Sequence, residues 1–313
     1  MAQRKSSSGS RQGEYRDRPT RTPDAGKPQH LGDDGDSNLA PGLYVTATPI
    51  GNARDITLRA LDALKGCDLI AAEDTRVTSK LLAIHGIARP LTAYNDHNAE
   101  RERPRLLERL RQQKRIVLVS DAGTPLVSDP GFKLVRAAIE EGVSVHVLPG
   151  ASAVLAGLAL SGLPSDRFLF AGFLSSKAGE RRTALEEFKS ERATLIFFES
   201  GMRLATCLKD MAEILGPRNA AVAREITKLH EEVRRGSLAD LARAYEQERA
   251  PKGEVTLLVS GAPRAEIDYV VVDEALAKAL AFMPLKPASE LIAGLLGISR
   301  HAVYARGLEK KNG

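Results

Sequence analysis

Ser120-Asp-Ala-Gly-Thr-Pro-Leu-Val-Ser-Asp-Pro-Gly131 is the stretch of this 313-residue chain that most strongly indicates its fold. The apolar, β-branched run Ile116–Val119 precedes it, and an amphipathic pattern that begins at Phe132 follows it. This order predicts a buried strand, a tight loop and the first turn of a helix. In open α/β sheets, ligands bind at such loops, outside the carboxyl ends of the strands.

The residues of this loop suit a ligand site. Gly123 has no Cβ where a ligand would approach the backbone, and Pro125 stiffens the turn. Asp129 is predicted to cap the following helix, with Pro130 in its first position. Asp121 is then free to face a ligand. An ordinary turn, in which the aspartates serve only local structure, is the alternative that these residues alone leave open.

Strand-like and helix-like segments alternate from Leu43 onward, which predicts an α/β fold with a mainly parallel sheet. The strands are predicted at 43–46, 69–72, 116–119, 145–148 and 168–171, and then at 194–198, 220–223 and 255–259. Helices are predicted after Asp55, before Gly86, after Pro104, and across 202–215 and 237–248. The predicted organisation is a disordered tail (1–40), a first α/β domain (41–164), a second α/β domain (165–262) and a helical C-terminal extension (268–313).

The tail and the rest of the chain differ in composition. Residues 1–40 are rich in Ser, Gly, Arg, Pro and Asp and contain few apolar side chains, so we predict that they are disordered. The whole chain has 45 Lys and Arg against 40 Asp and Glu, a net charge of +5. The tail contributes basic and acidic residues almost equally, so the rest of the chain also has a positive net charge. This charge favours an anionic partner. A weak nucleic-acid-binding arm and an inert solvated segment both fit the tail.

The sequence also predicts the setting of the protein. No apolar run reaches membrane-spanning length and the N-terminus is polar, so we expect a soluble, cytoplasmic protein with no membrane partner. The two cysteines are expected to be reduced thiols. Near the C-terminus, helical patterns on either side of Gly297 are typical of a small helix-turn-helix, although simple helix packing produces the same pattern.

Several common chemistries lack their motifs. The chain has neither the glycine-rich dinucleotide motif nor a P-loop, and no serine lies in a nucleophile elbow. His230-Glu-Glu232 begins like a zinc-binding helix, but Arg234 stands where the second histidine is needed. Histidine and cysteine are not spaced as metal ligands. We therefore predict a reaction that uses neither a protein nucleophile nor a metal.

Polar and glycine-containing loops follow or precede the predicted strands, and we expect them to gather at one edge. Each loop alone is explained by turns, helix caps or solvated ion pairs. Together they present carboxylates, hydroxyls and glycine backbone, which suit a ligand with a cationic centre and ribose hydroxyls. The loops are 48–52, 73–76, 121–125, 149–153, 199–203, 223–225 and 254–256.

These loops make the chain resemble the tetrapyrrole methylase superfamily, and within it the cytidine 2′-O-methyltransferases of small-subunit ribosomal RNA. The resemblance covers about Leu43 to Gly261 and is weaker through the last helices. It implies two α/β domains, S-adenosylmethionine in the cleft between them, and a homodimer. It also implies methylation of a cytidine ribose in the decoding region of 16S rRNA, within the small ribosomal subunit. The matching runs are Thr48–Asn52, Ala72–Arg76, Ser120–Pro125 with Ser128–Gly131, Pro149–Ala153 and Ala223–Lys228.

The resemblance and the strand-end positions together predict the site residues. Glu73 and Asp74 are candidates for a general base that removes the hydroxyl proton, although both also suit a structural ion pair with Arg76. Residues predicted to bind the cofactor are Pro49, Asp121, Gly123, Thr124, Val127, Ser152, Ala153, Met202, Ala223 and Glu254. Residues predicted to bind RNA phosphates are Arg76, Arg203, Arg224 and Lys228.

One departure from the family pattern lies directly before Arg203. Gly201-Met202 stands where the family usually has Pro-His, so any role of that histidine is absent here or is taken by another residue.

Two alternative functions are considered. A methylase of the same fold that acts on a tetrapyrrole or another small molecule is disfavoured by the runs at Glu73–Arg76 and Ala223–Lys228. A non-catalytic RNA-binding factor is disfavoured because Asp121, Gly123 and Ser152, which the resemblance assigns to the cofactor, are all present.

Overall fold

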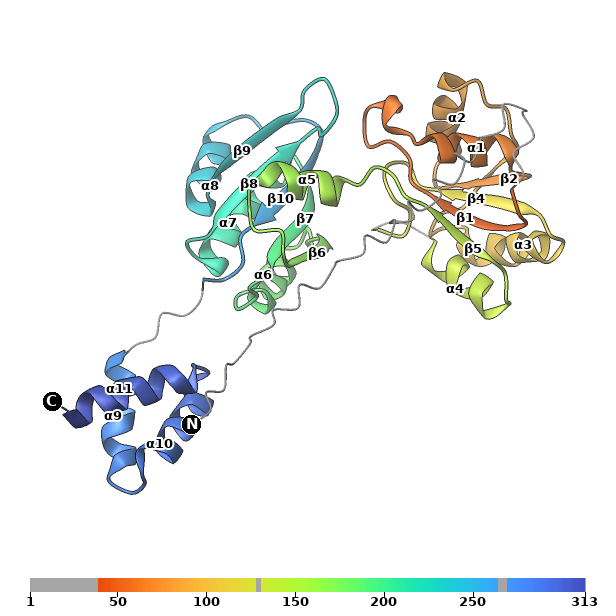
Figure 1. The fold of residues 1–313 in the computed structure, drawn as a ribbon. Helices are drawn as coiled ribbons and strands as arrows, with labels where there is room; N and C mark the ends of the chain where they lie inside the picture. The colour runs from red at the N-terminus through yellow and green to blue at the C-terminus, as the bar shows by residue number, and fades with distance from the viewer. Residues whose placement is uncertain (1–38, 128–130, 264–268, 313) are drawn as a thin grey trace, which may run out of the picture.

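Two β-sheets follow one another along the chain, and a cluster of three helices comes after them (Figure 1). The computed structural model describes residues 39–127, 131–263 and 269–312. The predicted tail, apart from Leu39 and Ala40, lies outside the described residues, as do Asp129 and Pro130 of the predicted helix start. We call residues 39–148 unit 1 and residues 153–263 unit 2.

The sheet of unit 1 is entirely parallel, as the alternating pattern predicts. Its strand order is β3-β2-β4-β1-β5. The strands are β1 (Gly42–Thr46), β2 (Leu69–Ala72), β3 (Leu91–Ala93), β4 (Arg115–Val119) and β5 (Val145–Leu148). The helices are α1 (Leu58–Gly66), α2 (Thr75–Ile84), α3 (Ala99–Arg111) and α4 (Phe132–Glu140), with a 3-10 turn at Ala53–Asp55.

Alternation along the central strands explains why this sheet carries helices on both faces. Val117 and Val119 pack into a core with α1 and α2, whereas Ile116 and Leu118 pack into a second core with α3 and α4. A strand buried on both faces is apolar at every position, and β4 therefore appears in the sequence as a continuous apolar run.

Two helices of unit 1 begin where the sequence pattern did not indicate. Helix α3 runs through Pro104, since it begins at Ala99, five residues before this proline, whereas the sequence pattern predicts the helix only after it. Helix α4 begins at Phe132 with Gly131 at the N-cap position, whereas the sequence pattern predicts Asp129 as the cap and Pro130 as the first helical residue, two positions that lie outside the described residues.

The sheet of unit 2 is mixed, in the order β6-β7-β10-β8-β9. Only β6 and β7 are parallel, and the other three pairings are antiparallel. The strands are β6 (Phe168–Phe173), β7 (Thr194–Ser200), β8 (Asn219–Arg224), β9 (Glu232–Ser237) and β10 (Glu254–Val259). The helices are α5 (Ala153–Ser161), α6 (Ala178–Glu187), α7 (Leu204–Leu215) and α8 (Leu238–Gln247).

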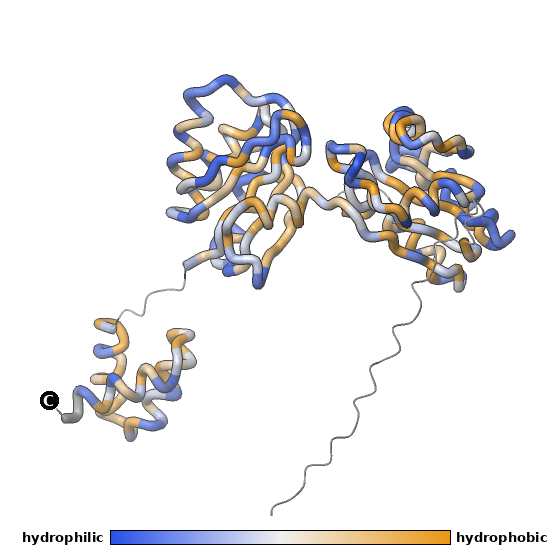
Figure 2. Tube along the Cα trace, turned by 45° about the horizontal axis from the view of Figure 1, so that its top comes forward, coloured by the Kyte–Doolittle hydropathy of each residue, from blue (hydrophilic) through white to orange (hydrophobic). Residues whose placement is uncertain are grey.

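Helices cover both faces of this second sheet. Val154 and Leu158 of α5 pack against Ile196, Ala221 and Leu258, so α5 belongs with unit 2, although it precedes the predicted domain boundary at residue 164. The other face packs against α6, α7 and α8. Figure 2 shows that hydrophobic residues follow the strands and the helix faces next to them, whereas hydrophilic residues lie mainly in loops and outer turns.

The last three helices form a small apolar core of their own. They are α9 (Tyr269–Leu280), α10 (Leu285–Leu296) and α11 (Arg300–Asn312). Val272, Leu276, Ile292 and Val303 are almost fully buried in this core. Gly297 ends α10 with a left-handed backbone, and this turn joins the two helices of the predicted helix-turn-helix. Across the described parts of the chain, no helix has the length and apolar character needed to cross a bilayer.

Candidate active site

The strand-end loops of the two units face one another across a cavity of about 350 Å³. In unit 1 all strands are parallel, so the loops that follow them lie at one edge of the sheet. In unit 2, β10 runs antiparallel to β7 and β8, and its first residue, Glu254, pairs with Ser200 at the end of β7. The beginning of one strand and the ends of two others therefore meet at the same place.

Most of the predicted cofactor residues line this cavity. Those that do are Asp121, Gly123, Thr124, Val127, Ser152, Ala153 and Glu254, together with the predicted base Glu73. Backbone hydrogen bonds between Thr48 and Gly123, and a bond from the Thr124 hydroxyl to the Ala151 carbonyl, fix the loops against one another.

Three predicted cofactor residues lie elsewhere. Pro49 lines a neighbouring hollow that also includes Lys228 and Glu254. The Met202 side chain is 87% exposed and lines a groove between α7 and α8, on another surface of unit 2. The Ala223 side chain is fully buried beneath α5, because it lies on the face of β8 that packs against this helix. The structure thus does not bring the side chains of Met202 and Ala223 to the cavity.

An apolar part of the cavity wall was missed in the sequence. Phe173 and Phe198 lie at the ends of β6 and β7, and their ring centroids are 5.6 Å apart in an edge-to-face arrangement. Ile226 and Val255 extend this wall. Such side chains look like ordinary core residues in a sequence, and only their position at strand ends near the polar loops would have distinguished them.

Glu73 and Asp121 are linked at the polar end of the cavity. A Glu73 carboxylate oxygen accepts a hydrogen bond from the Asp121 backbone N–H at 3.2 Å, and Asp121 accepts one from the Asp74 backbone N–H at 3.0 Å. Burial raises the pKa of Glu73, and the nearby carboxylates of Asp121, Asp96 and Asp74 raise it further. Burial also raises the pKa of Asp121. Glu73 is therefore the more basic carboxylate of the two catalytic candidates.

Asp74 has the opposite electrostatic character. Its carboxylate caps α2 by accepting the Arg76 backbone N–H at 2.8 Å, and it forms an ion pair with the Arg76 guanidinium at 2.6 Å. The hydrogen bonds from Arg76 lower the pKa of Asp74 to about 2. A carboxylate with this pKa is a weak proton acceptor, so the geometry favours the structural role for Asp74.

The four predicted RNA-binding cations are all held in ion pairs. Arg76 remains 86% exposed despite its contact with Asp74, and it lies at a polar hollow that shares Glu73 and Asp121 with the main cavity. Arg224 pairs with Glu232 at 3.0 Å, Lys228 pairs with Glu225 and Glu254 at 2.9 Å, and Arg203 pairs with Glu199 at 3.1 Å. The four pairs made by these last three cations are all contained within unit 2.

A loop of unit 2 also contacts unit 1 directly. The Thr227 hydroxyl accepts a hydrogen bond from the Asn52 backbone N–H at 3.1 Å, which joins the loop after β8 to the loop after β1. Glu225 and Thr227 both have left-handed backbone conformations, with φ of 51° and 67°. Strained residues of this kind persist where the surrounding structure fixes them. Here the bond from Asn52 to Thr227 and the bond from Lys228 to Glu225 hold this loop beside the cavity.

Gly201 is crowded by the segment before β10. A Cβ at this position would collide with the carbonyl oxygen of Pro251. The glycine that replaces the usual proline of the family pattern is therefore required by the path of the neighbouring backbone.

The described residues contain no cluster of three or more His, Cys, Asp or Glu side chains arranged to hold a metal ion. What the cavity offers is a carboxylate-rich end in unit 1 and an aromatic wall in unit 2.

Comparison with known proteins identifies the fold family. The family model described as Tetrapyrrole (Corrin/Porphyrin) Methylases matches residues 42–242, which span both units. The chain belongs to this family. A second model, described as the RsmI C-terminal HTH domain, matches residues 268–311, where the structure has the three-helix cluster.

Curated relatives of the family cover most of the chain. The chain is 50% identical over 275 residues to the "Ribosomal RNA small subunit methyltransferase I" of Mesorhizobium japonicum, with 88% of this chain and 94% of the relative covered. It is 44% identical over 272 residues to the protein of the same name from Haemophilus influenzae, with 85% and 96% covered.

Solved structures show the same fold at low identity. The uroporphyrin-III-C-methyltransferase of Thermus thermophilus matches with a TM-score of 0.52 and 21% identity, over 70% of this chain and 94% of that one. A structure of this enzyme complexed with S-adenosyl homocysteine matches with a TM-score of 0.50, 20% identity, and 69% and 96% coverage. A diphthine synthase matches with a TM-score of 0.52, 19% identity, and 70% and 89% coverage.

Proposed function

We propose that this chain is a methyltransferase that uses S-adenosylmethionine to methylate the 2′-oxygen of a cytidine ribose in the decoding region of 16S rRNA. The relatives at 44–50% identity, which are named small-subunit ribosomal RNA methyltransferases, support the RNA substrate. The assembled small ribosomal subunit is the proposed acceptor, which implies a cytoplasmic location. Methyl transfer from a sulfonium to oxygen needs neither a protein nucleophile nor a metal.

The cavity between the units is the observation that carries this proposal. Its aromatic wall suits a planar base, and its hydroxyls and backbone groups at Thr124 and Ser152 suit a ribose and an amino acid moiety. The carboxylates of Glu73 and Asp121 place negative charge where a sulfonium would be stabilised. These groups together fit S-adenosylmethionine, which supplies a methyl group bound to a positively charged sulfur.

The chain's own residues then orient the reaction and take up a proton. The two loops held together through Thr48 and Gly123 fix the donor side of the cavity, which reduces the entropic cost of aligning donor and acceptor. Glu73 is assigned as the general base, because its raised pKa suits it to accept the proton of the 2′-hydroxyl at a carboxylate oxygen.

The RNA enters, in this proposal, from the side of Arg76. Its exposed guanidinium lies at the polar hollow next to the cavity, where it can contact a backbone phosphate. RNA also presents the 2′-hydroxyl, which distinguishes it from DNA and is the methyl acceptor itself. Arg224 and Lys228 are assigned a structural role in the loop after β8, which contacts unit 1. Arg224 pairs there with Glu232, and Lys228 pairs with Glu225 and Glu254.

Alkaline hydrolysis of the product tests the ribose assignment. After incubation of purified small ribosomal subunits with the chain and S-adenosylmethionine, we expect one phosphodiester of 16S rRNA to become resistant to alkali, because a 2′-O-methyl group removes the attacking hydroxyl. Base methylation leaves that bond cleavable. Mass spectrometry of the fragments locates the methyl group. An incorporated methyl group with normal cleavage at the modified nucleotide contradicts the ribose assignment.

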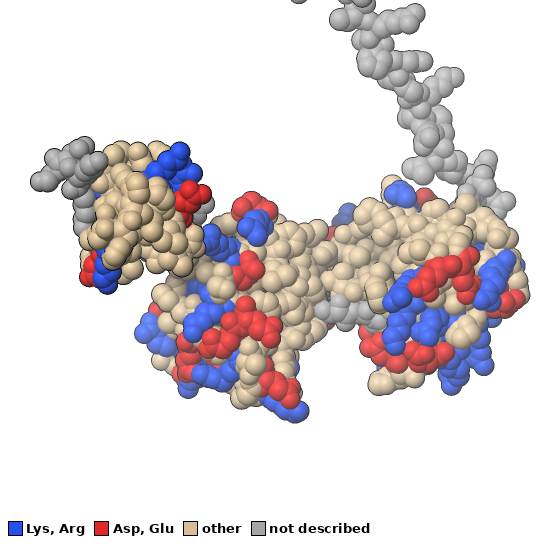
Figure 3. All heavy atoms as spheres, turned by 90° about the horizontal axis from the view of Figure 1, so that it is seen from below, with Lys and Arg blue, Asp and Glu red and all other residues tan. Residues whose placement is uncertain are grey.

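We further propose a homodimer. Exposed apolar side chains occur on β5, an edge strand of the sheet of unit 1, on the neighbouring helix α4, and on β6, an edge strand of the sheet of unit 2; Phe132, Ile139, Val147 and Phe168 are among them. On the face drawn in Figure 3, charged side chains lie mainly on the outer parts of the two units, whereas uncharged side chains predominate where the units meet. A second copy of the chain would cover such a surface with two-fold symmetry.

Light scattering at micromolar concentration tests this assembly. The full chain, and a shortened chain that begins at Leu39, are both expected to have the mass of two chains. Val147→Asp places a charge on the exposed edge strand and is expected to shift the mass toward one chain. Leu58→Asp, at an exposed position of α1, is the matched control and should remain dimeric. A monomeric unmodified chain counts against the proposal.

A further inference from the structure

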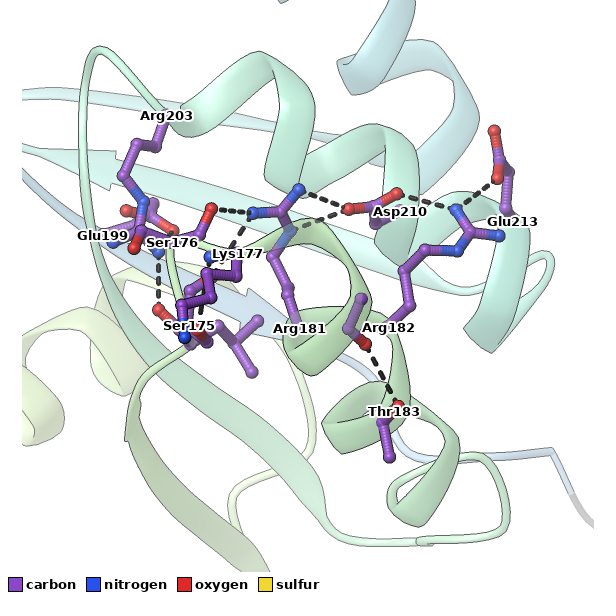
Figure 4. Close-up of polar contacts among 12 residues, drawn as sticks. Ser175, Ser176, Lys177, Arg181, Arg182, Thr183, Glu199, Arg203, Asp210 and Glu213 are labelled. Carbon is purple, nitrogen blue, oxygen red and sulfur yellow. Dashed lines mark hydrogen bonds and ion pairs between the residues drawn. The ribbon is translucent and has the colours of Figure 1, made fainter.

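Two arginines hold the loop that follows β6 by its backbone. Arg203 donates a hydrogen bond to the Leu174 carbonyl at 2.5 Å, and Arg181 donates to the carbonyls of Ser175 and Ser176, each at 3.3 Å (Figure 4). Three consecutive carbonyl groups are thus fixed by two guanidinium groups, which come from α6 and from the beginning of α7.

Buried carboxylates fix these guanidinium groups in turn. Arg203 pairs with Glu199, whose side chain is only 1% exposed, and Arg181 pairs with Asp210 at 2.7 Å (Figure 4). The second Glu199 oxygen accepts the Ser200 backbone N–H at 2.8 Å. The Glu199 carboxylate thus has a partner at each of its oxygens, and an ion pair with a buried carboxylate restricts the orientation of the groups that it joins.

The connection made by Arg203 joins two parts of the cavity wall. Phe173, directly before the fixed carbonyl of Leu174, lines the cavity and is 60% exposed. Glu199, at the other end of the connection, lines the same cavity beside Phe198. Arg203 therefore sets the ends of β6 and β7 against each other, directly next to the aromatic side chains.

The position of Phe173 in the cavity indicates which of the two substrates, the RNA or the methyl donor, would contact its ring. The polar hollow at Arg76 is lined only by residues of unit 1, and it shares Glu73 and Asp121 with the cavity. Phe173 lies in unit 2, away from that hollow. If RNA enters at Arg76, the aromatic wall is left for the donor, and aromatic side chains bind planar bases by stacking.

We propose that Arg203 is a positioning residue that holds Phe173 and Glu199 in place so that the Phe173 ring stacks against the purine of the methyl donor. This inference rests on the proposed function, since it assigns the aromatic wall of the same cavity. It replaces the phosphate contact predicted for Arg203. One of its amino groups is bound to Leu174 and Glu199, and its Nε atom is buried without a partner among the described residues.

Calorimetry with S-adenosylhomocysteine on the full chain is the direct test. Arg203→Met is expected to raise the Kd by about tenfold, comparable to the loss of one hydrogen bond to a charged group. Arg203→Lys keeps a charged group that can donate a hydrogen bond at this position, so it is expected to recover part of the affinity. The matched control is Arg182→Met, because Arg182 pairs with Asp210 and Glu213 in the same network but contacts none of the loop carbonyls. Its Kd should not change.

A double-mutant cycle separates positioning from a general structural effect. In a Phe173→Ala background, which itself weakens donor binding, Arg203→Met should add less than twofold, because the group that Arg203 positions is gone. Full additivity of the two changes overturns the proposal. If Arg203→Met does not fold, as judged by thermal melting, Phe173→Ala with Arg203→Lys completes the same cycle, and additivity there overturns the proposal equally.

Kinetics on purified small subunits distinguish the remaining outcomes. If Arg203→Met raises the KM for the small ribosomal subunit but leaves the Kd for S-adenosylhomocysteine unchanged, Arg203 acts on RNA and the inference is contradicted. An unchanged donor Kd in a well-folded Phe173→Ala variant contradicts it as well. If the unmodified chain binds the donor but methylates no subunit, the proposed acceptor fails while the calorimetric result for Arg203 still stands. If the unmodified chain does not bind the donor, both proposals fail.

Discussion

Glu73→Gln is expected to lower kcat for methylation of small ribosomal subunits by about 10²- to 10⁴-fold, the usual contribution of a general base. Glutamine preserves the shape of the side chain and can still accept the Asp121 backbone N–H, but it cannot take the hydroxyl proton. The Kd for S-adenosylhomocysteine should change by only a few-fold. Single-turnover kinetics and calorimetry measure the two effects separately.

The pH dependence gives this prediction a second measurement. Glu73 acts as a base only when ionised, so kcat should fall as the pH falls through its pKa. Because burial raises that pKa, the acid limb is expected above the ordinary range of glutamate. Asp74, with a pKa of about 2, would produce no limb in that range.

Asp74→Asn is the matched control for Glu73→Gln. Asparagine also caps helices well, so α2 should keep its N-terminus, and only the exposed ion pair with Arg76 is lost. We expect kcat to change by a few-fold at most. An equal, large loss of kcat in both variants, or an acid limb that persists in Glu73→Gln, contradicts the assignment of Glu73.

Gly123→Val is expected to weaken binding of S-adenosylhomocysteine by about 100-fold or more. Gly123 has φ of 78°, a conformation that a β-branched residue adopts only with strain of roughly 1–3 kcal/mol. Its Cβ would lie 3.3 Å from Ile50 Cγ2, so the valine methyl groups would crowd the cavity wall. Since the loop is fixed by hydrogen bonds to Thr48, it cannot easily move aside.

Gly142→Val separates the steric effect from backbone strain. Gly142 has a similar φ of 72°, but no atom lies within 4 Å of the position of its Cβ, and it is not part of the cavity. Both variants should therefore lower the Tm, and Gly123→Val should lower it more because of its crowding, whereas only Gly123→Val should lose affinity for S-adenosylhomocysteine. Equal affinities for the two variants would remove the Gly123 loop from the site.

The sequence predicted the strands well where burial on both faces makes every residue apolar. The strand at 116–119 is such a case, and its carboxyl-end loop does lie at the cavity. The pattern failed for α5, which is apolar on all sides and so lacks helical periodicity. It also failed for β9, an edge strand whose arginine and glutamate residues pair across its surface. The α5 segment lacks the spacing of apolar residues that predicts a helix, and the β9 segment lacks the alternation that predicts a strand.

The site was predicted less completely because its composition depends on tertiary contacts. Strand ends indicated where the loops gather, but not which side chains of a strand face the cavity. Ala223 is buried beneath α5, whereas the core-like Phe198 lines the cavity wall. Likewise, a sequence shows that Arg203 is a cation but not that Leu174 and Glu199 already bind it.

The contact between Gly201 and Pro251 has a consequence for exchanging parts between relatives. Because the Pro251 carbonyl occupies the space of a side chain at position 201, the Pro-His pair of the family pattern cannot be introduced here alone. Met202→His by itself would only place an imidazole on an exposed surface. An exchange of residues 201–202 with a relative that has a side chain at position 201 therefore also requires a different backbone path at Pro251, so these two distant segments have to be exchanged together.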